Sequence, residues 1–160
     1  MKVYHGSTSI IEHPIANAGR ERLDFGKGFY VTDIQSQAEA WADRMSRINE
    51  MPGVVSVYEL DIEKAKNQYS YKHFEHYDNE WLQYIVANRT GSTSIEKYDI
   101  IEGGVANDRV IDTVEAYIAN LMPLETALRE LSRHQPNNQT CICNQGIIDD
   151  HMTFVESYKI

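Results

Sequence analysis

The sequence predicts a single domain of the α+β class. Short apolar segments typical of strands are scattered between amphipathic segments typical of helices, without the strict alternation of a doubly wound parallel sheet. The chain has 160 residues, which is the usual size of one domain. Because no internal repeat, low-complexity tract or Gly/Ser-rich linker divides it, we expect one domain over residues 1–160.

The first part of the chain predicts two short strands, at residues 2–5 and 28–32, separated by an irregular loop over residues 7–24. Thr32 and Gln35 fit a capping box, so a helix is expected to begin there. Apolar residues then recur at spacings of three and four, which places them on one helix face as far as about residue 49: Ala38, Trp41, Ala42, Met45 and Ile48.

The rest of the chain predicts four more strands and three more helices. The strands are expected over residues 54–61, 98–105, 140–143 and 153–158. The helices are expected over residues 78–89, with Asp78 or Asn79 as the cap, and over two apolar stripes at residues 108–118 and 124–131.

Charge and composition exclude several classes of protein. With 24 acidic and 15 basic residues the net charge is -9, so the chain has no general attraction for phosphate backbones or anionic membranes. A local basic patch of Arg20, Arg22 and Lys27 still leaves nucleic acid open as a partner. No apolar run is long enough to span a membrane, and residues 1–7 lack the apolar core of a signal peptide, so we expect a cytoplasmic protein.

The only two cysteines, Cys141 and Cys143, suit a reducing compartment as free thiols. They could supply two metal ligands, with His134 and His151 on either side. Their spacing matches no common zinc pattern and no second cysteine pair exists, so we expect no metal site.

Three stretches combine polar or aromatic residues with glycine in ways that packing alone does not demand. His5 and Gly6 end the first strand, where a ring nitrogen and an uncovered backbone could meet a small molecule. The alternative is a turn with a structural histidine. Gln139 opens the third stretch, residues 139–143, where it shares one strand face with the two cysteines.

The second stretch, residues 24–32, leads into the helix that carries Trp41. Its Gly-Lys-Gly run precedes a strand, so it fits neither a dinucleotide fingerprint nor a P-loop. Tyr30 on the strand and Trp41 on the helix could face each other across a slot suited to a planar heterocycle. The alternative is that Phe29, Tyr30 and Trp41 are core residues.

Together these motifs resemble a bacterial domain family related to the ADP-ribosyltransferases of the diphtheria-toxin and poly(ADP-ribose) polymerase type. The resemblance covers nearly the whole chain. It rests on Tyr-His-Gly-Ser at residues 4–7, Phe-Gly-Lys-Gly-Phe-Tyr-Val-Thr at 25–32 with Trp41 following, Tyr-Asp-Ile-Ile-Glu-Gly-Gly-Val-Ala-Asn-Asp at 98–108, and Asn-Gln at 138–139.

The resemblance implies two small antiparallel sheets that form an NAD cleft. It implies that His5 holds a ribose hydroxyl, that Gly6 binds the nicotinamide amide, and that Tyr30 and Trp41 sandwich the nicotinamide ring. The residues it places around NAD are His5, Gly6, Ser7, Lys27, Gly28, Tyr30, Trp41 and Asn107. Asn107 is expected at a ribose or a target. Lys27 is expected at the pyrophosphate, with a solvated loop charge as the alternative.

The resemblance also implies that Gln139, with His5 and Tyr30, is catalytic. Active relatives usually have a glutamate where this chain has Gln139. Glutamine can accept a hydrogen bond from the ribose 2'-hydroxyl, but it has no charge to offset an oxocarbenium-like cation. Glu102 or Asp108 could supply a compensating carboxylate.

The function that follows from the resemblance is mono-ADP-ribosylation of a macromolecule, protein or nucleic acid, with NAD as substrate. The protein is expected to act as the toxin of a toxin–antitoxin or phage-defence pair, with an antitoxin protein as a further partner. The alternatives are an NAD glycohydrolase, a catalytically silent module that binds NAD or ADP-ribose, and a purely structural interaction protein.

Overall fold

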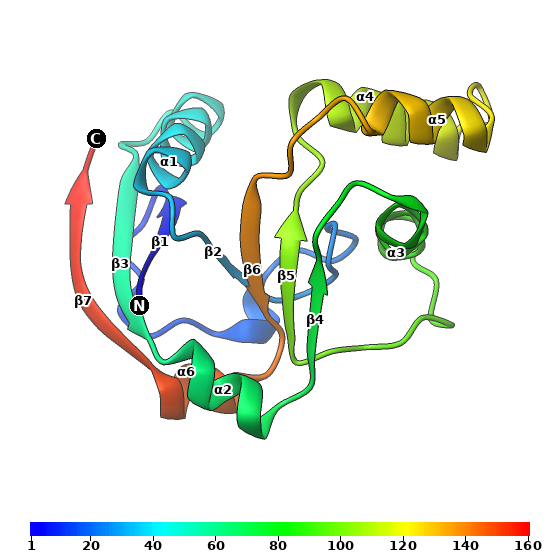
Figure 1. The fold of residues 1–160 in the computed structure, drawn as a ribbon. Coiled ribbons are helices and arrows are strands. Elements are labelled where there is room, and N and C mark those ends of the chain that lie inside the picture. Colours follow the sequence, from blue (N-terminus) through cyan, green and yellow to red (C-terminus); the bar gives the residue numbers. More distant parts are fainter.

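The computed structural model describes residues 1–160, except for the side chain of Asp108, and contains two sheets with helices around them (Figure 1). The first sheet is antiparallel, with the strand order β1-β3-β7. Its strands are β1 (Lys2–Ser7), β3 (Val54–Leu60) and β7 (Met152–Lys159). The α+β class predicted from the sequence is therefore confirmed.

The second sheet has the order β2-β6-β5-β4. Its strands are β2 (Phe29–Val31), β4 (Tyr71–Phe74), β5 (Ile100–Gly104) and β6 (Asn138–Ile142). The expectation of two antiparallel sheets is wrong here, because β4 and β5 are parallel. The helix α3 (Asn79–Arg89) connects these two strands, and such a crossover returns the chain in the same direction.

The remaining helices cover the sheets. In Figure 1, α2 (Ile62–Gln68) and α6 (Gln145–His151) lie at the lower end of the space between the sheets, and α1 (Gln35–Asn49) lies at the upper end of the first sheet. The helices α4 (Asp108–Ile118) and α5 (Leu124–Leu131) lie near α3 on the side of the second sheet. Among the described residues, no helix has the length and apolar character that crossing a membrane requires.

Three apolar clusters hold these layers together. One lies between the two sheets and includes Val3, Phe29, Tyr58, Leu60, Ile100 and Ile142. A second joins the second sheet to α3, α4 and α5 and includes Phe74, Trp81, Ile85, Ile101, Val114 and Leu131. The third is small and packs Ala38 and Ala42 of α1 against Val55 and Val57 of β3. Helix α1 is therefore packed against the first sheet.

The start and the apolar stripe of α1 differ from the prediction. The helix begins at Gln35 with Ile34 as its cap and no side-chain cap hydrogen bond, so the capping box of Thr32 and Gln35 is wrong. The Thr32 hydroxyl instead accepts from the Ile34 backbone N–H, at 3.1 Å. Only Ala38 and Ala42 of the predicted stripe are buried, while Trp41 and Ile48 are 48% and 62% exposed.

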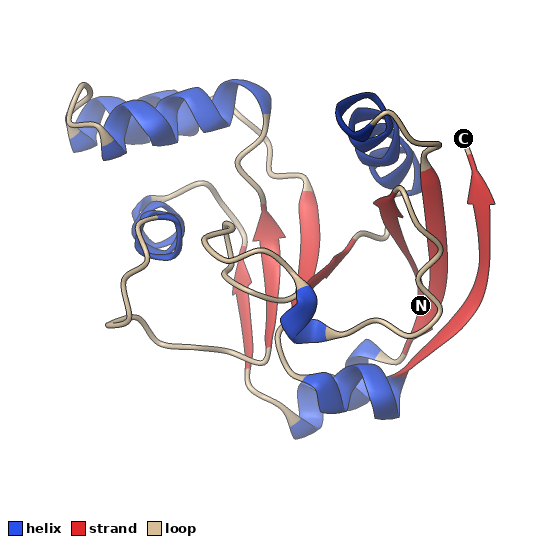
Figure 2. Ribbon diagram, turned by 180° about the vertical axis from the view of Figure 1, so that it is seen from behind, coloured by secondary structure: helices blue, strands red, loops and turns tan.

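Other elements agree with the prediction to within a few residues at each end. The Asp78 cap of α3 is confirmed, since its carboxylate accepts from the Trp81 backbone N–H at 3.0 Å. Three elements are absent from the prediction: α2, β4 and α6. The loop expected over residues 7–24 is largely irregular, with one 3-10 turn, η1 (Ala16–Ala18). Figure 2, which views the molecule from behind, shows this loop running from the first sheet toward the second.

Candidate functional site

The two sheets meet at a single backbone bridge between β1 and the residue that follows β2. Tyr4 and Thr32 exchange both backbone hydrogen bonds, at 2.8 and 3.0 Å. Beyond this bridge the two strands separate, and a cavity of about 50 Å³ lies beside it. The cavity is lined from four elements and the β2–α1 turn, by Tyr4, His5, Gly6, Tyr30, Val31, Thr32, Gln37, Ala38, Trp41 and Gln139.

His5 spans the gap between the separating strands. Its Nδ1 lies 2.7 Å from the carbonyl oxygen of Tyr30, and because a carbonyl only accepts, Nδ1 carries the hydrogen. Nε2 is then a free acceptor, with no hydrogen-bond partner in the described part of the chain. Burial lowers the pKa of His5, while the bond to Tyr30 acts in the opposite direction, and the ring stacks on Phe29 with centroids 4.4 Å apart. The imidazole is therefore neutral and fixed as one tautomer.

Gly6 presents its backbone to the same gap. Hydrogen bonding alternates along an antiparallel strand, and Tyr4 points its N–H and C=O toward Thr32, so Gly6 points its own groups to that side. There the partner strand has already separated. A Cβ atom at Gly6 would lie 2.1 Å from the Ala38 carbonyl oxygen, so the glycine also allows α1 to pack closely.

Tyr30 and Trp41 differ in how firmly their rings are held and in their exposure to solvent. The Tyr30 hydroxyl donates to the Gly26 carbonyl at 2.6 Å and accepts from the Phe25 N–H at 3.1 Å, which fixes the ring, and burial raises its pKa well above the ordinary value. Trp41 is 48% exposed and is the one lining residue that is largely open to solvent. The core interpretation therefore holds for Phe29, which is 7% exposed, and is wrong for Trp41.

Gln139 reaches the cavity from β6, where its backbone is opposite Gly103 and its side chain is half-buried. No carboxylate, lysine or arginine lines the cavity among the described side chains. Glu102 does not compensate for the missing glutamate, since it lies outside the lining and is bound by the Tyr71 hydroxyl at 2.6 Å and by Lys66 at 3.6 Å. The side chain of Asp108 lies outside the described structure.

The sequence matches the model of one known protein family. Residues 1–154 match the model of the family described as "Protein of unknown function (DUF3990)". The chain belongs to the DUF3990 family. No match was found among curated proteins or among solved structures.

The structure does not bring every predicted residue of this DUF3990 chain to the cavity. His5, Gly6, Tyr30, Trp41 and Gln139 line it together, whereas Ser7, Lys27, Gly28 and Asn107 do not. The Ser7 hydroxyl donates to the Ser9 carbonyl, and Lys27 is exposed on the loop before β2. Gly28 is packed against β6, where a Cβ atom would lie 2.4 Å from the Cys141 sulfur, and Asn107 caps the start of α4.

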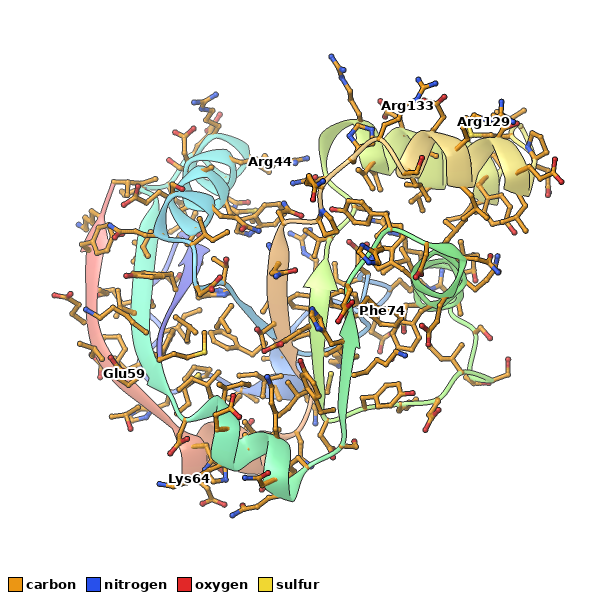
Figure 3. All side chains as sticks on the ribbon, in the orientation of Figure 1. Arg44, Glu59, Lys64, Phe74, Arg129 and Arg133 are labelled. Atoms are coloured by element: carbon orange, nitrogen blue, oxygen red, sulfur yellow. The ribbon has the colours of Figure 1, made fainter. Side chains whose placement is uncertain are left out.

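Five lining residues were not predicted as site residues: Tyr4, Val31, Thr32, Gln37 and Ala38. Gln37 and Thr32 line the cavity, and Gln37 precedes Trp41 by four residues, a spacing that places both on one helix face and could have revealed it. Arg44 lies next to Trp41, with its guanidinium carbon 5.5 Å from the ring centroid, on the side of α1 that faces α4 and α5 (Figure 3). It brings a positive charge beside Trp41 at the cavity.

A larger hollow of about 280 Å³ lies between β4, α3 and the loop before β5. Phe74, which Figure 3 labels, lines it with Tyr84 and Tyr98. Its charged groups already have partners, because Lys72 pairs with Glu80 and the Tyr98 hydroxyl donates to Glu96. The cavity beside the bridge is smaller but holds unpaired polar groups, so it is the better candidate site. No cluster of three or more metal-ligating side chains occurs among the described residues.

Proposed function

We propose that this protein binds NAD in the cavity beside the Tyr4–Thr32 bridge and is a mono-ADP-ribosyltransferase acting on a macromolecule in the cytoplasm, as the toxin of a toxin–antitoxin or phage-defence pair. One observation carries the proposal. Five residues that the family resemblance assigns to NAD, far apart in the sequence, line one small cavity: His5, Gly6, Tyr30, Trp41 and Gln139.

The polar groups of the cavity suit nicotinamide. The Gly6 backbone offers one donor and one acceptor side by side, which matches the acceptor and donor of a primary carboxamide. The Tyr30 and Trp41 rings supply stacking surface for the pyridine ring. Pockets for whole ligands usually measure about 300–1,000 Å³. The cavity therefore has to widen to admit the pyridine ring. Trp41 is the lining side chain most exposed to solvent, so its movement would widen the cavity.

In the proposed reaction the bond between nicotinamide and the ribose breaks, nicotinamide leaves with the bonding electron pair, and an acceptor nucleophile attacks the ribose carbon and loses its proton. His5 Nε2 accepts a hydrogen bond from a ribose hydroxyl and Gln139 from the 2'-hydroxyl. An uncharged Gln139 offsets little of the positive charge that develops on the ribose. We therefore expect slow turnover.

The uncharged lining favours one alternative, a catalytically silent module that binds NAD or ADP-ribose. The same lining leaves open an NAD glycohydrolase, in which water is the acceptor. All three functions share the same binding site and differ in what happens to the bound nucleotide.

One assay separates these functions. The purified protein and its Gln139→Ala variant are incubated with radiolabelled NAD and a cell lysate, and free nicotinamide and label in the protein and nucleic-acid fractions are followed. Transferred label that disappears in the variant supports the transferase and identifies its acceptor class. Nicotinamide without transfer indicates a glycohydrolase, and NAD binding without either indicates a silent module. Absence of NAD binding contradicts the proposal.

A further inference from the structure

The cavity beside the bridge contains an unpaired buried amide. The side-chain nitrogen of Gln37 is buried and has no hydrogen-bond partner in the described structure, and it is the one buried side-chain nitrogen or oxygen there in that condition. Leaving a buried donor unpaired costs about 1–3 kcal/mol, so such atoms usually have a role. Gln37 lines the cavity, which makes a ligand the natural partner.

Neighbouring residues hold this amide in place. The Thr32 hydroxyl lies 3.2 Å from Gln37 Oε1, and 3.3 Å from the backbone carbonyl of Asn138 in β6. Thr32 also accepts from the Ile34 N–H at the start of α1. The Thr32 hydroxyl thus has the Gln37 oxygen and the Asn138 carbonyl as acceptors for its one hydrogen, and Gln37 Nε2 has no partner in the described structure.

Four unpaired polar groups lie on the β1 and α1 side of this cavity of about 50 Å³. Two are donors, the Gly6 N–H and Gln37 Nε2, and two are acceptors, the Gly6 carbonyl and His5 Nε2. Since a water molecule occupies about 30 Å³ in the liquid, the space admits a group of only a few heavy atoms. A primary carboxamide has two lone pairs on its oxygen for the two donors and a hydrogen on its nitrogen for the Gly6 carbonyl, while His5 Nε2 is left for the ribose hydroxyl.

We propose that Gln37 donates the second hydrogen bond to the carboxamide oxygen of nicotinamide, while the Gly6 carbonyl accepts from the amide nitrogen and so distinguishes a primary carboxamide from a carboxylate. The inference rests on the proposed function. A carboxylate in the same place has no hydrogen to offer the Gly6 carbonyl and brings its charge against that acceptor. Nicotinic acid is therefore excluded, with an affinity at least about a hundredfold below that of nicotinamide, as expected when buried polar groups are left unpaired.

The test compares ligands that differ in one atom. Nicotinamide and thionicotinamide, whose sulfur is a weaker acceptor, are titrated by calorimetry into the wild type, Gln37→Leu and the control Gln35→Leu. Gln35 carries the same side chain on the first turn of α1 but bonds Glu39 and Tyr158 outside the cavity. Gln37→Leu should weaken nicotinamide binding about tenfold and reduce the penalty of the oxygen-to-sulfur change, while Gln35→Leu does neither.

Each result has a distinct meaning. If the wild type binds nicotinamide and NAD, but Gln37→Leu binds both pyridine amides as the wild type does, this inference is wrong and the proposed function stands. The same holds if Gln37→Leu weakens both amides equally, which indicates a structural role. If Gln37→Leu instead changes the discrimination against 3-acetylpyridine, which lacks the NH₂ group, Gln37 is an acceptor and the assignment as a donor is wrong. If the wild type binds none of these ligands, the proposed function itself is contradicted.

Discussion

His5 combines a structural and a binding role in one ring. Its Nδ1–H closes the gap at Tyr30 where β1 and β2 separate, and this bond leaves Nε2 as the acceptor for a ligand hydroxyl. Burial lowers the pKa of His5, so the folded protein keeps the ring neutral at pH values where the unfolded chain already binds a proton. The two interpretations of a strand-end histidine, structural and ligand-binding, therefore apply to different nitrogens of one side chain.

The lowered pKa of His5 predicts acid sensitivity. Its contribution to stability is present above the ordinary histidine pKa of about 6.5 and is lost as the pH falls through the lower pKa of the folded state. The free energy of unfolding, measured with denaturant from about pH 8 down to about pH 5, should fall more steeply in the wild type than in His5→Gln. NAD affinity should fall over the same acidic range, because protonated Nε2 no longer accepts. Parallel curves for the two proteins would contradict this account.

Gln139 is the residue at which a single substitution should raise activity. In Gln139→Glu a carboxylate enters a cavity without other charges and stabilises the developing cation. We expect nicotinamide release to rise about a hundredfold, which is about 2.7 kcal/mol of the barrier. The rate of nicotinamide release from saturating NAD measures this. Thr140→Ser, a neighbour on β6 that does not line the cavity, is the control and should leave the rate unchanged. A rate for Gln139→Glu equal to the wild type would show that this side chain does not face the reacting ribose.

At the scale of elements, α1 carries three side chains of the site within about two turns. Gln37 and Trp41 line the cavity and Arg44 lies beside Trp41, while Ala38 and Ala42 hold the helix on the first sheet. The buried and ligand-facing residues thus share one amphipathic segment. The sequence pattern placed Trp41 in one apolar stripe with Ala38 and Ala42, because periodicity alone does not separate a core face from the rim of a cavity.

Arg44 should contribute to binding the phosphates of NAD and leave nicotinamide binding unaffected. Its guanidinium lies over the Trp41 ring, so it is the cation nearest the proposed nicotinamide site that the contacts identify. We expect Arg44→Ala to weaken NAD binding by about 1 kcal/mol, the value of an exposed charge pair. Arg47→Ala, which removes an arginine paired with Asp43 on the same helix, is the matched control. Equal effects of the two variants on NAD, measured by calorimetry at low salt, would contradict the assignment.

The loop before β2 positions Tyr30 through a buried ion pair. Asp24, whose side chain is 8% exposed, receives the Arg89 guanidinium from α3 at 2.6 Å and the Ala106 backbone N–H at 2.7 Å. The next two residues, Phe25 and Gly26, hold the Tyr30 hydroxyl. The Asp24 carboxylate thus fixes the loop to α3 and to the segment after β5. It thereby holds the two residues that bind the Tyr30 hydroxyl.

Asp24→Ala should destabilise the fold by about 3 kcal/mol, because it leaves a largely buried guanidinium without its partner. Asp43→Ala breaks an exposed pair on α1 and should cost at most about 0.5 kcal/mol. Urea unfolding of the two variants beside the wild type measures both values. Similar losses for the two would mean that the Asp24–Arg89 pair does not hold the loop.

At the scale of the whole molecule, the sequence predicted the class of the fold and part of the site. Strands such as β3 were predictable because Val54, Val55 and Val57 favour an extended backbone, and β3 is buried on both faces as the centre of its sheet. The four residues of β4 show no such pattern and pair in parallel through a crossover, which only the tertiary structure determines. The short helices α2 and α6 have side-chain caps at Asp61 and Asn144, but with two buried residues each they show no extended apolar stripe.

The part of the site that was predictable consists of motif residues that lie beside the bridge between the sheets. His5, Gly6, Tyr30, Trp41 and Gln139 were expected to act together, and they line one cavity. Lys27 and Asn107 were assigned from the resemblance, but neither lines the cavity. Gln37 was missed because a glutamine on a helix is usually solvent-exposed, although its four-residue spacing from Trp41 places both on one helix face.

The central claim, that nicotinamide binds against Trp41, has a direct optical test. The chain has two tryptophans, and Trp81 is fully buried in α3 with its indole N–H bonded to the Gly104 carbonyl. Titration with NAD should quench wild-type tryptophan emission to saturation. In Trp41→Phe, where calorimetry should still detect binding through the retained aromatic ring, the emission of Trp81 should stay constant. Unquenched emission in the wild type together with no heat of binding would contradict the claim.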